Sequence, residues 1–135
     1  MKKIILFIFI INFFLHVNVY PQNKHKENNL AILWTSGDKE VAEKMVFMYA
    51  YHMKKEWDNL VLIVWGPSSK LLSKDKSLQN YIAKLQKVGV KIVACKACAD
   101  MYKVTNKLKK LNIEVKYMGK PLTQYLKSNW KILSF

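Results

Sequence analysis

The stretch Val90-Lys91-Ile92-Val93-Ala94-Cys95-Lys96-Ala97-Cys98 joins two kinds of local pattern. Its first half is rich in β-branched residues, which is typical of a buried strand. A helical pattern starts directly after Cys95 and continues to Leu111, with Met101 and Leu108 on one side. The stretch therefore predicts a strand that ends where a helix begins, which is the repeating unit of an α/β fold.

The only two cysteines of the 135-residue chain, Cys95 and Cys98, lie in this stretch. A thiol at the first turn of a helix lies near free N–H groups and the positive end of the helix dipole, which favour the reactive thiolate. Lys96 adds a positive charge beside it. We therefore expect Cys95 to lie exposed and ionised at the end of its strand. Together with Cys98, it would form the catalytic site.

Outward from this stretch, short apolar runs alternate with helical patterns. The expected strands are 30–34, 60–65, 90–94, 113–117 and 130–135, and the expected helices are 41–55, 78–88, 96–111 and 122–126. Strands separated by helices imply right-handed crossovers and parallel pairing. We predict one α/β domain, a three-layer sandwich in which a mainly parallel five-stranded sheet has helices on both faces.

The helix expected at 41–55 contains the one histidine predicted to lie inside the domain, His52. It falls in helical register with Val41, Met45 and Met48, so we expect a packed or half-buried side chain rather than a catalytic one. The methionines of this helix, with the nearby tryptophan at position 57, are expected to serve core and interface packing. The strand tryptophans at positions 34, 65 and 130 are expected to pack between sheet and helices.

Residues 1–20 differ from the rest of the chain. Two lysines precede an apolar run, 4–15, whose length suits a secretory signal peptide and is shorter than a membrane span. The run is not followed by a typical small-residue cleavage site, so an uncleaved membrane anchor is the alternative. We expect 21–29 to be a polar tether and 30–135 to be the domain. It would be exported to the periplasm, or held at the membrane only through its N-terminal segment.

The chain carries 23 basic and 9 acidic side chains, a formal charge of +14. This excess would suit an acidic partner such as nucleic acid or a membrane surface. However, every basic residue is lysine and none is arginine, the residue suited to bidentate contacts with bases and phosphates. We therefore expect no nucleic-acid partner.

Ligands of open parallel sheets bind beyond the carboxyl ends of the strands. The small and polar residues expected at that edge could line a pocket or hold an anion, and they are Thr35, Ser36, Gly37, Asp38, Gly66, Lys96, Met118 and Gly119. Nucleotide binding is not expected, because the chain lacks both a Gly-x-Gly-x-x-Gly run and a phosphate loop. The simpler role for Ser36 or Asp38 is to cap the following helix.

Several of these residues also carry a family resemblance. They are Thr35-Ser36-Gly37-Asp38 after the first strand, Gly89-Val90 before a strand that ends Ala94-Cys95, Tyr117-Met118-Gly119 before Pro121-Leu122, and a final strand that ends in Phe135. In their order and spacing, from Leu30 to Phe135, the chain resembles the DsrE/DsrF-like family, which includes sulfur-relay proteins.

The resemblance implies a three-layer α/β fold and a homo-oligomer of ring-like or stacked form. In sulfur-relay members, a cysteine after the third strand accepts sulfane sulfur as a persulfide and passes it on, and Cys95 falls at that position. The implied partners are a sulfur donor or acceptor protein, or a small sulfane-sulfur compound, and no cofactor is implied. Cys98 is additional to the relay pattern.

Two other functions remain open from the residues. Cys95-x-x-Cys98 is the spacing of thiol–disulfide redox proteins, and an exported chain would meet an oxidising compartment. Alternatively, the domain is a non-catalytic oligomeric binding module, so the sequence leaves open whether it is an enzyme. A metal site is not expected, because two cysteines supply fewer ligands than zinc requires.

Overall fold

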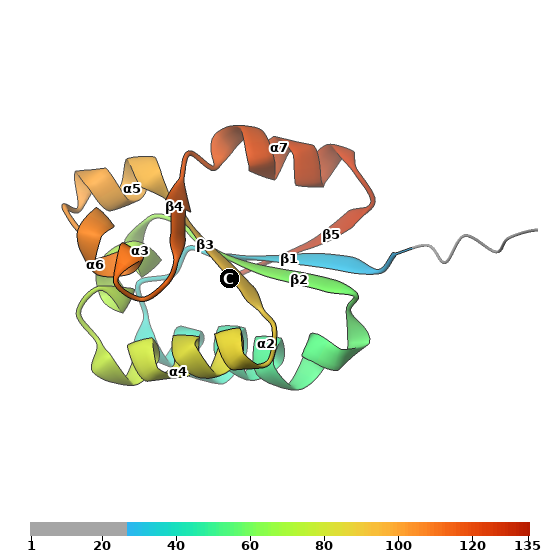
Figure 1. Cartoon of the computed structure of the whole chain (residues 1–135), viewed down its shortest axis with the longest axis horizontal. Helices are drawn as coiled ribbons and strands as arrows, with labels where there is room; N and C mark the ends of the chain where they lie inside the picture. The colour runs from blue at the N-terminus through green and yellow to red at the C-terminus, as the bar shows by residue number, and fades with distance from the viewer. Residues whose placement is uncertain (1–26) are drawn as a thin grey trace, which may run out of the picture.

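The computed structural model describes residues 27–135 as a five-stranded sheet between helices (Figure 1). The strands are β1 (Asn29–Trp34), β2 (Asn59–Val64), β3 (Lys91–Cys95), β4 (Glu114–Lys116) and β5 (Trp130–Ser134). The helical elements are the π-helix η1 (Val41–Phe47), α2 (Met48–Met53), the 3-10 helix η2 (Lys54–Glu56), α3 (Pro67–Leu72), α4 (Lys76–Lys87), α5 (Lys96–Met101), α6 (Thr105–Lys109) and α7 (Gly119–Lys127). The signal or anchor predicted at 1–20 lies outside the described residues, as does most of the tether. Within 27–135, no helix has the length and apolar character needed to cross a membrane.

The strand order is β4-β3-β2-β1-β5, and every neighbouring pair is parallel. Consecutive strands β1 to β4 lie side by side, and α7 then carries the chain across the sheet to β5 at the opposite edge (Figure 1). This topology confirms the predicted parallel three-layer sandwich. It also brings the carboxyl ends of all five strands to one edge of the sheet.

Successive side chains of a strand point to opposite faces, and both faces of the central strands are buried. Ile32 and Leu62 face the layer formed by η1, α2 and α4, which lies below the sheet in Figure 1. Ala31, Ile63 and their neighbours on β3 pack instead against side chains of α5 and α7 above it. Burial on both sides explains why these strands are continuous apolar runs in the sequence.

The strand tryptophans pack as expected. Trp34 is fully buried, and its ring meets Phe47 of η1 edge to face, with 5.0 Å between ring centroids. Trp130 packs against Tyr125 of α7, with centroids 4.5 Å apart. These contacts join β1 to the lower helical layer and β5 to the upper one.

The expected burial of the helix at 41–55 is wrong in detail. Met45 and Met48 are 48% and 46% exposed, and His52 is exposed as well. With Phe135 they line a surface hollow of about 420 Å³. Two apolar stripes lie next to each other in this segment, and the stripe that includes Ala42, Val46, Phe47 and Ala50 is the one that is buried.

The helix expected at 96–111 is broken into α5 and α6. Lys103 has a φ of +55°, and the Val104 amide donates to the Ala99 carbonyl at 2.8 Å, which together form a left-handed helix end. Gly89, with a φ of +86°, ends α4 in the same way, as its sequence position predicts. The break at Lys103 was missed because no glycine marks it. Helix α3, which starts at Pro67, was also missed.

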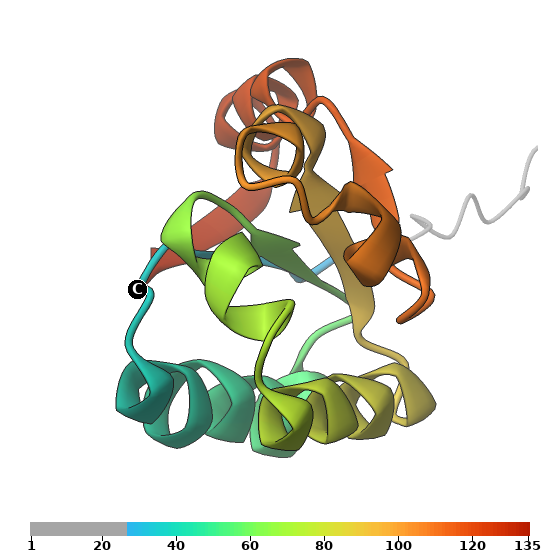
Figure 2. The same cartoon turned by 90° about the vertical axis from the view of Figure 1, so that its left-hand side faces the viewer.

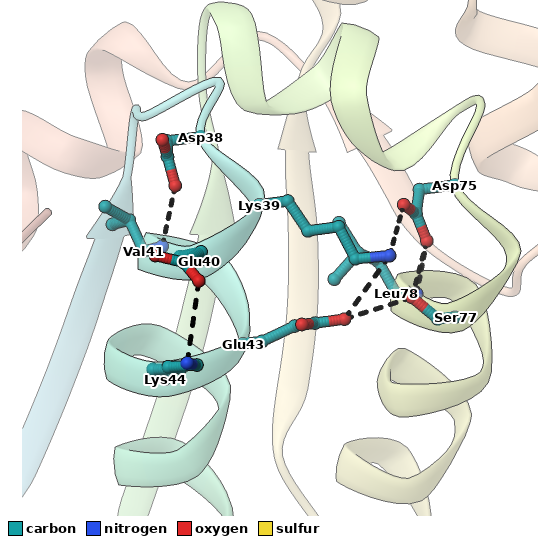
Figure 3. Close-up of polar contacts among 9 residues, drawn as sticks. All are labelled: Asp38, Lys39, Glu40, Val41, Glu43, Lys44, Asp75, Ser77 and Leu78. Atoms are coloured by element: carbon teal, nitrogen blue, oxygen red, sulfur yellow. Dashed lines mark hydrogen bonds and ion pairs between the residues drawn. The ribbon is translucent and has the colours of Figure 1, made fainter.

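A polar network joins the start of η1 to the start of α4 (Figure 3). The Asp75 carboxylate accepts hydrogen bonds from the Ser77 hydroxyl at 2.7 Å, the Lys39 ammonium at 2.9 Å and the Leu78 amide at 3.0 Å. Glu43 of η1 lies 3.6 Å from the Lys39 ammonium. These contacts lower the pKa of Asp75 well below its usual range, with the Ser77 hydrogen bond as the largest cause and that from Lys39 second.

Replacement of this carboxylate should reveal how much the network stabilises the fold. Because the pKa of Asp75 is lower in the folded state, its contribution is present above the ordinary carboxyl pKa and is lost as the pH falls through the folded-state value. We expect Asp75→Asn to lower Tm by several degrees at pH 7, with the difference from wild type shrinking in strong acid. Thermal unfolding followed by circular dichroism from pH 7 to pH 2 measures this.

Glu40→Gln is the matched control. Glu40 forms only an exposed i,i+4 ion pair with Lys44, at 3.5 Å, and exposed pairs of this kind stabilise proteins little. An equal loss of Tm in the two variants, or a loss in Asp75→Asn that does not change with pH, would contradict the role assigned to the network.

Candidate functional site

The two cysteines lie at the junction of β3 and α5. Cys95 is the last residue of β3 and the N-cap residue of α5, with φ −70° and ψ 114°, and Cys98 lies in the first turn of that helix. Both thiols are free. They belong to the apolar cluster on the upper face of the sheet, together with Val93 and Met118. The strand-to-helix junction predicted from the sequence is confirmed.

The expectation that the Cys95 thiol is exposed is wrong. Cys95 is only 3% exposed, whereas Cys98 is partly exposed. The alternation along β3 explains this, because Cys95 points to the same face as Val93 and is covered there by the cluster that contains Met118. Cys98, one turn into α5, is therefore the sulfur atom that solvent reaches more readily.

The electrostatics at Cys98 also differ from the expected thiolate site. Burial raises the pKa of Cys98, and its interaction with the Cys95 thiol acts in the same direction. The amide N–H of Gly66 acts in the opposite direction without reversing the effect. The protonated thiol is therefore favoured at Cys98. Both side chains belong to the same apolar cluster.

Lys96 does not direct its charge at the thiols. Its ammonium group forms an ion pair with Asp100, one helical turn later, and lies 5.2 Å from the ring centroid of Tyr117. Asp100 also accepts a hydrogen bond from the Thr105 hydroxyl at 2.6 Å, which ties α5 to α6. Lys96 thus fixes local structure beside the site.

The loop after β1 forms hydrogen bonds with the last residue, Phe135. The amide N–H groups of Thr35 and Ser36 donate to the main-chain oxygen of Phe135 at 2.8 and 3.3 Å, and the Thr35 hydroxyl donates to the same atom at 2.7 Å. Asp38 accepts from the Val41 amide at 3.0 Å, so it caps the following helix. The expected capping role is confirmed, and the N–H groups of Thr35, Ser36 and Asp38 in the suggested anion cradle already have a partner.

Gly66 connects this loop to the thiols. Its φ of +68° lies in the left-handed region, and its amide lowers the pKa of Cys98 against the larger, opposite effect of burial. The next residue, Pro67, packs closely on Gly37, where an added Cβ would lie 3.2 Å from the Pro67 Cβ. Met118 is buried over Cys95, and Gly119 is exposed at the start of α7. Gly37 thus lies against the segment that follows Gly66, while Met118 packs with Cys95 in the apolar cluster.

The sequence assigns no role to three further residues at this edge. The buried Ser68 hydroxyl donates to the Trp34 carbonyl at 2.7 Å and accepts from the Trp65 amide at 3.0 Å, so it ties together the ends of β1 and β2. Asp100 could have been found from its i,i+4 spacing to Lys96. Tyr117 carries no local sequence signal for its position beside that lysine.

Chemically, the arrangement offers two interacting thiols, one buried and one within reach of solvent. Within residues 27–135, no group of three or more His, Cys, Asp or Glu side chains could hold a metal ion. The chemistry that these side chains support by themselves is thiol exchange. It requires the deprotonation of a sulfur atom and uses no prosthetic group.

Comparison with known proteins agrees with the fold. A conserved protein of unknown function from Bacteroides thetaiotaomicron is 39% identical, with a TM-score of 0.77, over 80% of this chain and 95% of its own. The ychN protein from E. coli has the same fold at 13% identity, with a TM-score of 0.60, over 80% of this chain and 99% of its own.

No protein with a curated description matches the chain. A model of one family, described as DsrE/DsrF-like, matches residues 28–135, which include every strand and both cysteines. This match confirms the resemblance noted in the sequence, and the chain belongs to the DsrE/DsrF-like family.

Proposed function

We propose that this protein carries sulfane sulfur on its Cys95–Cys98 pair and passes it to a partner. The observation that carries the proposal is that two free cysteines lie in one apolar cluster at the junction of β3 and α5, at the carboxyl edge of the sheet. Membership of a family that includes sulfur-relay proteins favours the same chemistry. The donor, the recipient and a homo-oligomeric assembly remain predictions.

The difference in burial suggests separate roles for the two thiols. Cys98 is partly exposed, so it is the thiol that a donor reaches, and once it has lost its proton to solvent it attacks the outer sulfur atom of a donor persulfide. The sulfur–sulfur bond of the donor breaks, the donor thiolate leaves with the electron pair, and Cys98 becomes a persulfide. A recipient thiolate then attacks the outer sulfur and regenerates the Cys98 thiolate. The family resemblance implies that Cys95 is the acceptor. This assignment gives that role to Cys98 instead.

Cys95 provides a second outcome for the bound sulfur. Its thiolate can attack the inner sulfur atom of the Cys98 persulfide, which expels hydrosulfide and forms a Cys95–Cys98 disulfide. The outer sulfur atom is reduced, and the two cysteines are oxidised together. Because Cys95 is buried, outside thiols do not reach its sulfur atom, and this second reaction stays between the two cysteines.

The neighbouring thiols also support a second candidate function, thiol–disulfide exchange without sulfur transfer. In the oxidising compartment to which the predicted signal peptide would send the chain, this pair would rest as a disulfide. The two functions differ in a product that can be measured, because only sulfur transfer adds a sulfur atom to the protein.

Mass spectrometry after incubation with a small persulfide donor tests the proposal. We expect the reduced wild-type protein to gain the mass of one sulfur atom, and Cys98→Ser to lose this gain. Cys95→Ser, the matched control, should keep the added sulfur for longer because the resolving thiol is absent.

Other outcomes of this experiment identify the alternatives. Loss of loading in Cys95→Ser alone would return the acceptor to Cys95. Formation of a disulfide without any added sulfur would favour the redox function, and an unreactive pair would favour a binding module.

The pH dependence of alkylation tests the state of Cys98. Because burial raises its pKa, the folded protein should react with iodoacetamide more slowly at pH 7 than the protein unfolded in urea, and the midpoint of its rate profile should lie at higher pH. The measurement uses Cys95→Ser, so that only one thiol reacts. A midpoint below that of the unfolded chain would contradict this description of the site.

A further inference from the structure

A groove between α4 and α6 gathers positive charge. Its volume is about 500 Å³, and its charged lining residues are Lys74, Lys76, Lys107 and Lys110, which we call the lysine groove. Ser73, Gln79 and Leu111 complete the lining. Figure 2 shows α6 above the layer that contains α4. Residues from both helices line the groove. It is distinct from the junction of β3 and α5 that holds the thiols.

The charge of the lysine groove is not compensated inside the described part of the chain. Among residues 27–135, none of its four lysines forms an ion pair, whereas Lys39, Lys96 and Lys116 each pair with a carboxylate. Asp75 lies between two groove lysines in the sequence, but its carboxylate turns toward Lys39 and Ser77 instead (Figure 3). The groove therefore presents an uncompensated field to an anionic partner.

The groove continues into a trough of about 280 Å³ that runs along α4. Side-chain amides of Asn80, Gln86 and Asn112 line it. The Gln86 amide donates to the Leu111 carbonyl at 3.0 Å and to the Asn112 carbonyl at 3.2 Å, which holds the wall of the trough in place. Side-chain amides carry both donors and acceptors, so they can pair with the main chain of a peptide.

We propose that the lysine groove and this trough bind an acidic segment of a partner protein. The lysines attract its carboxylates, and the amides contact its main chain. A concave groove fits a single extended chain better than a flat membrane surface. No aromatic side chain lines it to stack on bases, which disfavours single-stranded nucleic acid. This interaction does not depend on the proposed sulfur chemistry.

Fluorescence anisotropy tests the proposal with the full-length protein and a labelled peptide in which Glu alternates with Ser. We expect saturable binding that weakens with added salt, and no binding of the same peptide with Gln in place of Glu. Lys107→Glu combined with Lys110→Glu should weaken binding at least about tenfold, because two attractions become repulsions.

The matched control is Lys120→Glu combined with Lys127→Glu on α7, which changes the net charge equally outside the groove. This variant should bind the peptide with a dissociation constant within about threefold of the wild-type value. Salt screens the interaction between the peptide and exposed charges that lie more than a Debye length away. Equal weakening in both double variants, or tighter binding of an oligonucleotide of equal charge, would overturn the proposal.

Circular dichroism confirms that each variant is folded, and Lys107→Gln with Lys110→Gln should give an intermediate loss of affinity. Cys95→Ser with Cys98→Ser should bind the peptide normally, which separates this proposal from the proposed function.

Discussion

The burial of both faces of β1, β2 and β3 is the constraint on which the rest of this structure depends. Side chains of these strands alternate between two apolar clusters, and each cluster needs its own layer of helices. Parallel pairing then sends every connection through a helix and brings all strand ends to one edge. The thiols, Gly66 and the Thr35–Asp38 loop meet there because each of them lies at or directly after the carboxyl end of a strand.

The same constraint determines the character of the thiol site. Because Cys95 continues the alternation of β3, it shares the buried face of Val93 and Met118. Cys98 escapes full burial because the chain has already turned into α5. The result is a pair with one shielded sulfur atom and one accessible sulfur atom. The separate roles that we propose for the two thiols depend on this difference in access.

Charge in this molecule is organised by local pairing. Lysines beside acidic residues of η1, α5 or β4 form ion pairs that stabilise helix starts and strand ends. Asp75 has a double effect, because it caps α4 and pairs with Lys39 instead of the lysines of the groove. The excess of lysine over acidic residues, which looks like compositional bias in the sequence, therefore forms a localised positive surface in the folded chain.

The sequence by itself determined the class of fold, because continuous apolar runs between helical patterns permit few arrangements other than a parallel sheet with two helical layers. It also determined the junction at Cys95, a helix cap at Ser36 or Asp38 and the helix end at Gly89, all of which depend on nearby residues. Only the tertiary structure decided which stripe of the helix at 41–55 is buried, since Met45 and Ala42 both lie at helical spacing. It also decided that Cys95 is enclosed while Cys98 is reachable. Burial depends on what packs on a face from elsewhere in the chain, and no local pattern contains that information.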